Sequence, residues 1–180
     1  EPLTADFREG VMSIAIIDSC ATDAPATPAA PEALATTLRI EGWVRKPLEL
    51  DAAALDAMDG TLVQDFDVIC TWDGSHGVLP PVRAVFLGDL IMRAHPAFEQ
   101  RVDYKRTALV AEGRGGYRAL YSWGEVFNSP LGRGIVVAYA QDGSALPLDK
   151  GTFVLFSRHD VATGPRYVQG LRRIELVKVW

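Results

Sequence analysis

The sequence predicts a β-dominated, mixed α+β domain, and three observations carry this expectation. Short apolar stretches recur between residues 38 and 180, several of them alternating with polar residues as half-buried strands do. Glycine- and proline-containing breaks separate these stretches, which is typical of strands joined by tight turns. Helical patterns are confined to two or three short segments. Taking the elements in order, we expect about eight strands in total.

Residues 1–37 are predicted to be an N-terminal extension. They hold one strand candidate, residues 11–17, followed by the run ATDAPATPAAPEALATT, which has almost no large apolar side chain. Alanine, proline and threonine in this proportion form linkers or straps and cannot build a core. We therefore place the folded domain at residues 38–180.

The first half of this domain should alternate strands with short helices. The segment LRIEGWV alternates as a strand, and Asp51 is well placed to cap the helix AAALDAM. A strand over residues 62–72 carries Cys70 into a glycine-bounded loop that contains His76 and ends at Pro81. An extended segment over 82–86 leads into a helix over 88–94, which Pro96 stops.

The second half is predicted to be mostly strands. Two of them form a hairpin across the glycines of GRGG, and Asp142-Gly143 makes a tight turn after a strongly apolar strand. The expected strands are residues 107–112, 117–122, 135–141, 152–157 and 174–180, with a helical turn at 123–127 and a polar loop, RHDVATGPR, before the last strand.

Composition and charge exclude several classes of partner. The formal net charge is −5, whereas nucleic acids and anionic membranes reward a basic surface. No apolar run approaches the ~20 residues that a membrane-spanning helix needs. We therefore expect no nucleic-acid partner and no membrane span.

The two cysteines, Cys20 and Cys70, are either joined in a disulfide or not, and the sequence leaves both possibilities open. If joined, they close a loop of about 50 residues and add roughly 4 kcal/mol of stability in the chain-entropy model, which suits an exported protein. If not joined, Cys70 is a core residue or a ligand. The chain starts at Glu1, for which a cleaved export signal or a trimmed tag would each account. We expect a periplasmic or exported protein, with the cytoplasm as the alternative.

From residue 38 onward the order of several weak motifs resembles the molybdopterin-binding domain of the sulfite oxidase family. The motifs are GWVRKPLELDAAALDAM, VICTW, VFLGDLIMRA, GYRALYSWGEVF, IVVAYAQDGSALPLDKG and GPRYVQGLRRIELV. The chain looks most like the small, single-domain members of that family. The resemblance implies the sulfite-oxidase-like fold and a molybdopterin (molybdenum cofactor), which the small members need not retain.

The resemblance also implies a metal ligand. At two places, however, the sequence departs from the catalytic members of the family. Cys70 stands where the family has the cysteine thiolate that ligates molybdenum, and a thiolate suits a soft, redox-active metal. The catalytic members' Trp-x-Gly is replaced here by Val82-Arg83-Ala84. Their Gly-Pro-x-Arg, whose arginine helps to hold the cofactor, is replaced by Gly151-Thr152-Phe153-Val154.

Five residues are the candidates for binding a cofactor, each with a plainer alternative. Cys70 is the candidate metal ligand or a buried core cysteine. His76 could reach a bound phosphate or substrate, or be a solvated loop residue. Arg114, Arg158 and Arg166 could grip a phosphate in bidentate fashion, or be ordinary surface arginines. The three histidines have no zinc-site spacing.

Two functions from different classes follow. One is an active molybdenum-pterin oxidoreductase, with Cys70 as metal ligand and a redox partner protein. The other, which we favour, is a family member without turnover or bound cofactor, serving as a small-molecule or protein-binding module in the cell envelope. A purely structural role is third. The first predicts a reachable Cys70 in a groove lined by arginines. The second predicts a Cys70 that is packed shut or disulfide-bonded.

Overall fold

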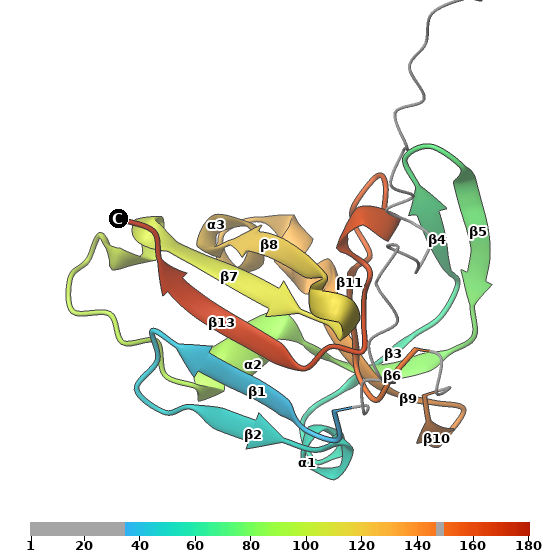
Figure 1. Cartoon of the computed structure of the whole chain (residues 1–180), viewed down its shortest axis with the longest axis horizontal. Helices are drawn as coiled ribbons and strands as arrows, with labels where there is room; N and C mark the ends of the chain where they lie inside the picture. The colour runs from blue at the N-terminus through green and yellow to red at the C-terminus, as the bar shows by residue number, and fades with distance from the viewer. Residues whose placement is uncertain (1–34, 147–149) are drawn as a thin grey trace, which may run out of the picture.

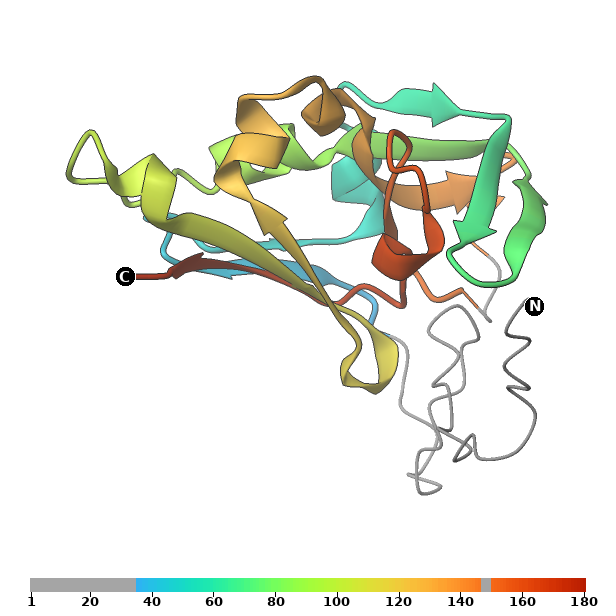
Figure 2. The same cartoon turned by 90° about the horizontal axis from the view of Figure 1, so that it is seen from above.

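The computed structural model of the protein describes residues 35–146 and 150–180, which form two larger sheets and a separate hairpin (Figures 1 and 2). The strands are β1 (Leu38–Gly42), β2 (Leu48–Leu50), β3 (Thr61–Val63), β4 (Phe66–Cys70), β5 (Gly74–Leu79), β6 (Val82–Phe86), β7 (Thr107–Glu112), β8 (Arg118–Ser122), β9 (Ile135–Gln141), β10 (Ser144–Ala145), β11 (Val154–Ser157), β12 (Val168–Gln169) and β13 (Arg173–Lys178). The helices are α1 (Ala52–Asp56), α2 (Leu87–Arg93) and α3 (Trp123–Phe127), with 3₁₀ turns η1 (Asp103–Arg106), η2 (Arg114–Gly116), η3 (Pro130–Gly134) and η4 (Gly164–Arg166).

The first sheet joins the two ends of the described chain. Its strand order is β2-β1-β13-β7-β8, so the C-terminal strand β13 lies between β1 and β7. The β1–β13 pair is parallel, and the other pairs are antiparallel. Figure 1 shows β13 in red crossing this sheet next to β1 in blue. The first and last strands therefore hold each other in place.

The second sheet is built around β9, in the order β12-β11-β9-β6-β3. The sequence of β9, IVVAYAQ, shows no apolar–polar alternation because both of its faces are covered. Ile135 and Val137 belong to the larger core, while Val136 and Ala138 face a smaller core on the other side. The strand is therefore the shared wall of two apolar cores.

The larger core takes side chains from both sheets and from the helices. Leu109 and Ile174 come from the first sheet, Val85 and Leu155 from the second, and Leu90 of α2 joins them, all with no exposed surface. The smaller core lies under the β4–β5 hairpin. There Phe66 of β4 stacks on Phe156 of β11, with ring centroids 4.4 Å apart. Burial of such aromatic side chains is the main force that holds the hairpin against the second sheet.

Most of the elements expected from the sequence are confirmed. The Asp51 side chain accepts from the Ala54 backbone N–H and caps α1. The β7–β8 hairpin forms across the expected glycines, and α2 ends before Pro96. Asp142 and Gly143 both have positive φ angles in the turn between β9 and β10. The short strands β2, β10 and β12 are additions, and the fold is a β-dominated α+β structure as predicted.

Two expectations around Cys70 are wrong. The strand predicted over 62–72 is broken at Asp65, whose φ is +56°, so β3 pairs with β6 while β4 turns away to pair with β5. The loop predicted to contain His76 is the strand β5. Its glycines, Gly74 and Gly77, have positive φ angles yet stay in a strand, because an irregular, twisted hairpin tolerates such residues where a flat strand does not.

Three further expectations have different outcomes. The strand candidate at 11–17 lies outside the described residues, and the division at residue 37 stays a prediction. Within residues 35–146 and 150–180, no helix is long and apolar enough to cross a membrane.

Candidate functional site

The candidate site lies at the tip of the β4–β5 hairpin. Cys70 ends β4 and pairs with Gly74, the first residue of β5, across the turn formed by Thr71, Trp72 and Asp73. The φ of Gly74 is +79°, a conformation that costs a glycine little because it has no Cβ. The tight turn brings the end of one strand and the start of the next side by side.

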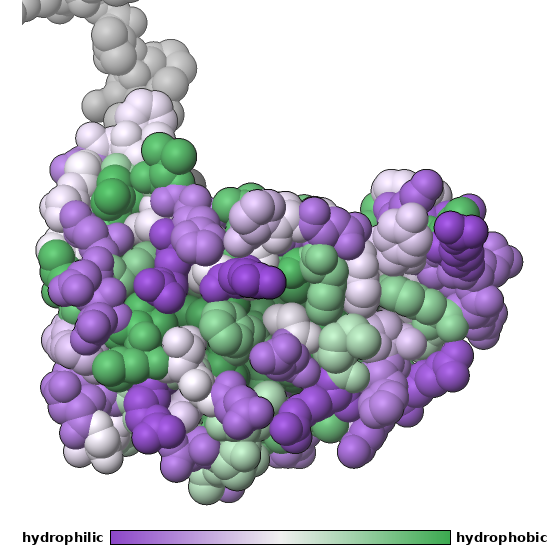
Figure 3. Space-filling model, turned by 180° about the vertical axis from the view of Figure 1, so that it is seen from behind, coloured by the Kyte–Doolittle hydropathy of each residue, from purple (hydrophilic) through white to green (hydrophobic). Residues whose placement is uncertain are grey.

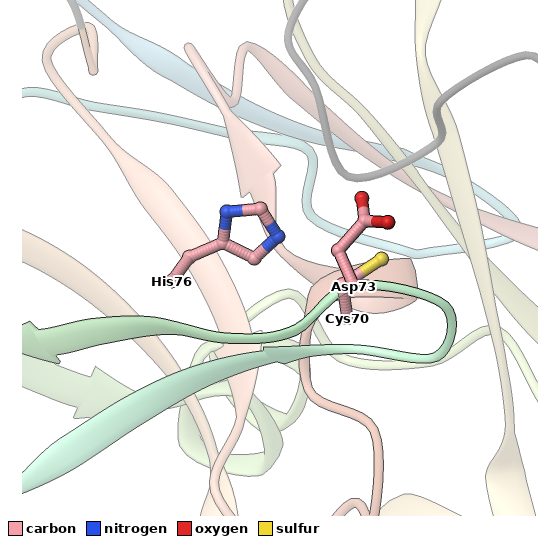
Figure 4. Close-up of side chains that lie close together, drawn as sticks. All are labelled: Cys70, Asp73 and His76. Carbon is pink, nitrogen blue, oxygen red and sulfur yellow. The ribbon is translucent and has the colours of Figure 1, made fainter.

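Three side chains with metal-ligating atoms meet there (Figure 4). The Cys70 sulfur, an Asp73 carboxylate oxygen and an imidazole nitrogen of His76 all lie within 4.8 Å of one another. Cys70 is 3% exposed, whereas Asp73 and His76 are exposed. The cluster therefore has a buried sulfur at its base and two side chains free to adjust at its rim.

Cys70 is disulfide-bonded. The other cysteine of the chain, Cys20, lies outside the described residues. A disulfide sulfur carries no negative charge, and it is the thiolate that acts as a metal ligand and a nucleophile. In this state Cys70 offers no thiolate. The second of the two functional readings predicted a Cys70 that is packed shut or disulfide-bonded.

The polar loop between β11 and η4 packs against β4. The Thr163 hydroxyl accepts from the Ile69 backbone N–H at 2.7 Å and donates to the Asp67 carbonyl at 2.9 Å. These two backbone groups flank the point where the register of the β4–β5 pairing shifts. Thr163 therefore supplies a hydrogen-bond partner to two backbone groups of β4, next to the irregular part of the hairpin.

Arg166, one of the predicted phosphate-binding residues, is held by carboxylates instead. Its Nε donates to Asp160 at 2.7 Å and its Nη1 to Glu125 at 2.8 Å, while the guanidinium lies 4.6 Å from the Tyr121 ring centre. The hydrogen bond to Asp160 is the main reason that the pKa of Arg166 is raised. Because both carboxylates are engaged, the guanidinium is neutralised by the protein itself.

The pKa values of Glu125 and Tyr121, which both lie next to Arg166, are shifted as well. Burial alone would raise the pKa of Glu125, but hydrogen bonds with Ser122 and Arg166 together lower it. Glu125 and Ser122 also form a capping box at the start of α3. Burial raises the pKa of Tyr121, whose hydroxyl donates to the Arg166 carbonyl at 3.3 Å. The arrangement is a partly buried ionic network that joins η4 to α3 and β8.

The remaining predicted residues are spread over the surface. His76 stands on β5 in the cluster with Cys70. Arg114 opens the η2 turn and Arg158 follows β11, and both are exposed. The structure thus brings together Cys70 and His76 and does not bring the three arginines to them as a phosphate site. Sequence reasoning missed Asp73 as a third member, although it lies midway between Cys70 and His76.

Two hollows bear on which ligands the described surface can hold. The one between β5 and the second sheet, next to Tyr167, measures about 10 Å³, room for one water. The other is an open groove of about 570 Å³ between α2, α3 and η3, and its lining contains no residue of the β4–β5 hairpin. The groove is lined by Phe86, Gly88, Asp89, Met92, Val126, Phe127, Ser129, Gly132 and Arg133.

The hydropathy of one face of the molecule can be seen from behind in Figure 3. Apolar residues gather in the middle of this face, and hydrophilic residues surround them.

The fold and site together define a β-dominated α+β domain with a disulfide-bonded cysteine at a hairpin tip. Comparison with solved structures finds that the chain is similar in fold to the sulfane dehydrogenase SoxCD of Paracoccus pantotrophus, with a TM-score of 0.55 and 20% sequence identity. The match covers 79% of this chain and 38% of that one, so this chain corresponds to well under half of that protein. No family model matches the sequence. No curated protein matches it either.

Proposed function

We propose that the chain is a molybdopterin-binding-domain-like protein of the sulfite oxidase fold that carries no cofactor and works as a binding module in an oxidising compartment. The observation that carries the proposal is the disulfide at Cys70. The residue that matches the family's metal ligand is withdrawn from ligation while that bond lasts.

The residues around the hairpin do not fit a pterin-molybdenum group in this state. Cys70 offers no thiolate, and the guanidinium of Arg166 is already paired with Asp160 and Glu125. The hollow between the hairpin and the second sheet is about 10 Å³, whereas ligand pockets typically measure some 300–1,000 Å³. These residues therefore support no chemistry through that cofactor in this state.

The disulfide also supports the proposed location. Such bonds persist in the periplasm and outside the cell, whereas cytosolic thiols are kept reduced. A periplasmic or exported protein is therefore part of the proposal. Trp72 is a reasonable contact for a protein partner, because it is 75% exposed at the hairpin tip and tryptophan is enriched in interfaces.

The second candidate function is an active molybdenum-pterin oxidoreductase in which Cys70 ligates the metal. The observation in its favour is the position of Cys70 at the end of β4, next to the C-terminal polar loop that Thr163 holds against that strand. The likeness to a sulfane dehydrogenase agrees with a redox fold, and both candidates share it. The state of Cys70 separates them.

The test is expression in a host that makes the molybdenum cofactor, followed by metal analysis and thiol counting. We expect no molybdenum and no reactive thiol in the unfolded, non-reduced chain. A Cys20→Ser variant, which leaves Cys70 as the sole cysteine, should also contain no molybdenum. Stoichiometric molybdenum in the wild-type protein, or in this variant, would establish the second candidate instead.

A further inference from the structure

Cys70, Asp73 and His76 are the strongest cluster of ligating side chains in the part of the chain that the structure describes. The set offers one sulfur, one nitrogen and one oxygen atom, the donors that zinc takes in proteins. We propose that these three residues form a redox-gated zinc site. Zinc is excluded while Cys70 is disulfide-bonded and is bound when a dithiol reduces that bond. The inference goes beyond the proposed function and does not depend on it.

The distances suit a site that closes on a metal. Zinc holds ligand atoms at about 2.0–2.3 Å, so tetrahedral ligands lie roughly 3.3–3.8 Å apart. The three ligand atoms here lie within 4.8 Å of one another. They need to approach by about 1 Å. Asp73 and His76 are exposed, so their side chains can rotate that far without disturbing the core.

The hairpin supplies the rigidity that a ligand set needs. Cys70 and Gly74 are paired across the turn, which fixes the separation of the two strands at the site. The Ser75 hydroxyl donates to Asp67 at 2.7 Å and links β5 to β4 one position further along the ladder. The sulfur is thus fixed and the two exposed ligands move towards it.

The gate follows from charge. In the disulfide-bonded state only a carboxylate and an imidazole face the site, and both are solvated. After reduction, zinc can displace the proton of the Cys70 thiol, and the resulting thiolate adds a full negative charge at the buried end. Three protein ligands then leave a fourth position for water, as in zinc sites that remain open.

The redox step balances as a thiol–disulfide exchange. A dithiol gives up two electrons and two protons and becomes a disulfide, while the disulfide at Cys70 is cleaved to two thiols. Zinc binding then displaces the remaining proton from the Cys70 thiol. The metal is released when an oxidant of the disulfide class restores the bond.

The test compares three forms of the full chain by Zn²⁺ calorimetry and by Co²⁺ absorption. The forms are the oxidised wild type, the wild type reduced with a trialkylphosphine and desalted, and Cys20→Ser without reductant. We expect one equivalent of Zn²⁺ and a thiolate-to-cobalt charge-transfer band in the last two forms only. Equal Zn²⁺ affinity in the oxidised form would overturn the gate.

Matched variants locate the ligands. In the Cys20→Ser chain, Asp73→Asn and His76→Asn should each weaken Zn²⁺ binding at least tenfold. Asp142→Asn and His95→Asn, which change the same residue types at other exposed positions, should leave it unchanged. Equal binding by the site variants and the controls would overturn the assignment. Circular dichroism checks that each form is folded. Loss of structure in both the reduced wild type and the Cys20→Ser variant would also overturn the proposal.

Discussion

The Thr163 hydroxyl lies 2.7 Å from the Ile69 backbone nitrogen, although 94 residues separate them in the sequence. This single side chain connects the polar loop before β12 to the strand that ends at Cys70. Thr163 is itself 3% exposed, so water does not compete for its contacts. The geometry of the hairpin tip therefore depends on a residue from the far end of the chain.

Replacing Thr163 with valine should destabilise the protein by about 1–3 kcal/mol. The change keeps the shape but leaves the partly buried Ile69 N–H and Asp67 carbonyl without that partner. Urea unfolding measures the effect, and hydrogen exchange at Ile69 should accelerate. Thr163→Ser retains the hydroxyl and should lose about 1 kcal/mol or less. Equal loss in both variants would show that the methyl group, not the hydroxyl, matters.

Replacing Arg166 with alanine should cost about 2–4 kcal/mol, because Asp160 and Glu125 would keep their charges without their common partner. Lysine should not restore the lost stability, since it cannot make the forked contact with Asp160. Arg158→Ala, at an exposed position in the same loop, is the matched control and should change stability by less than about 0.5 kcal/mol. A neutral result for Arg166→Ala would mean that the network contributes nothing net.

The stability of the protein should fall in acid partly through Glu112. Arg173, with Arg172 and Arg118, outweighs burial and lowers the pKa of Glu112 to about 2 from an ordinary value of 4.5. The folded-state pKa lies below the unfolded one, so the contribution is complete above pH 4.5 and is lost as the pH falls towards 2.

The Glu112→Gln variant isolates this contribution. The difference in the free energy of unfolding between wild type and variant should be about 1–3 kcal/mol at pH 7 and should shrink below pH 4.5. Urea unfolding at several pH values measures it. Glu99→Gln, at an exposed position, should show no such trend. A difference that stays constant with pH would contradict the assignment.

Replacing Gly132 with alanine should destabilise the η3 turn by about 2–4 kcal/mol. A Cβ at this position would overlap the Val126 carbonyl oxygen, so α3 and η3 would have to separate. Gly124→Ala is the control within α3, where the new Cβ meets only the Ser122 hydroxyl at 3.8 Å. It should be neutral or stabilise by up to about 1 kcal/mol. Thermal melts compare the two, and equal melting temperatures would refute the close approach.

Local elements could be predicted well because their causes are local. The cap at Asp51, the turn at Asp142-Gly143 and the apolar run of β9 each depend on residues adjacent in the sequence. The break at Asp65 could not be predicted, because the residues on its two sides are equally strand-like. The two segments become separate strands because β3 pairs with β6 whereas β4 pairs with β5. Strand pairing depends on residues outside the segment itself.

The candidate site divides in the same way. From the sequence alone we could infer the β-dominated class, the acidic net charge of −5 and the candidate residues Cys70 and His76. The packing of the folded chain then places Arg166 against Asp160 and Glu125, Thr163 against β4, and Asp73 in the cluster. Hydrophobic periodicity reports which face of a segment is buried. It carries no information about which distant polar group will meet that segment, because that depends on how the sheets and loops pack.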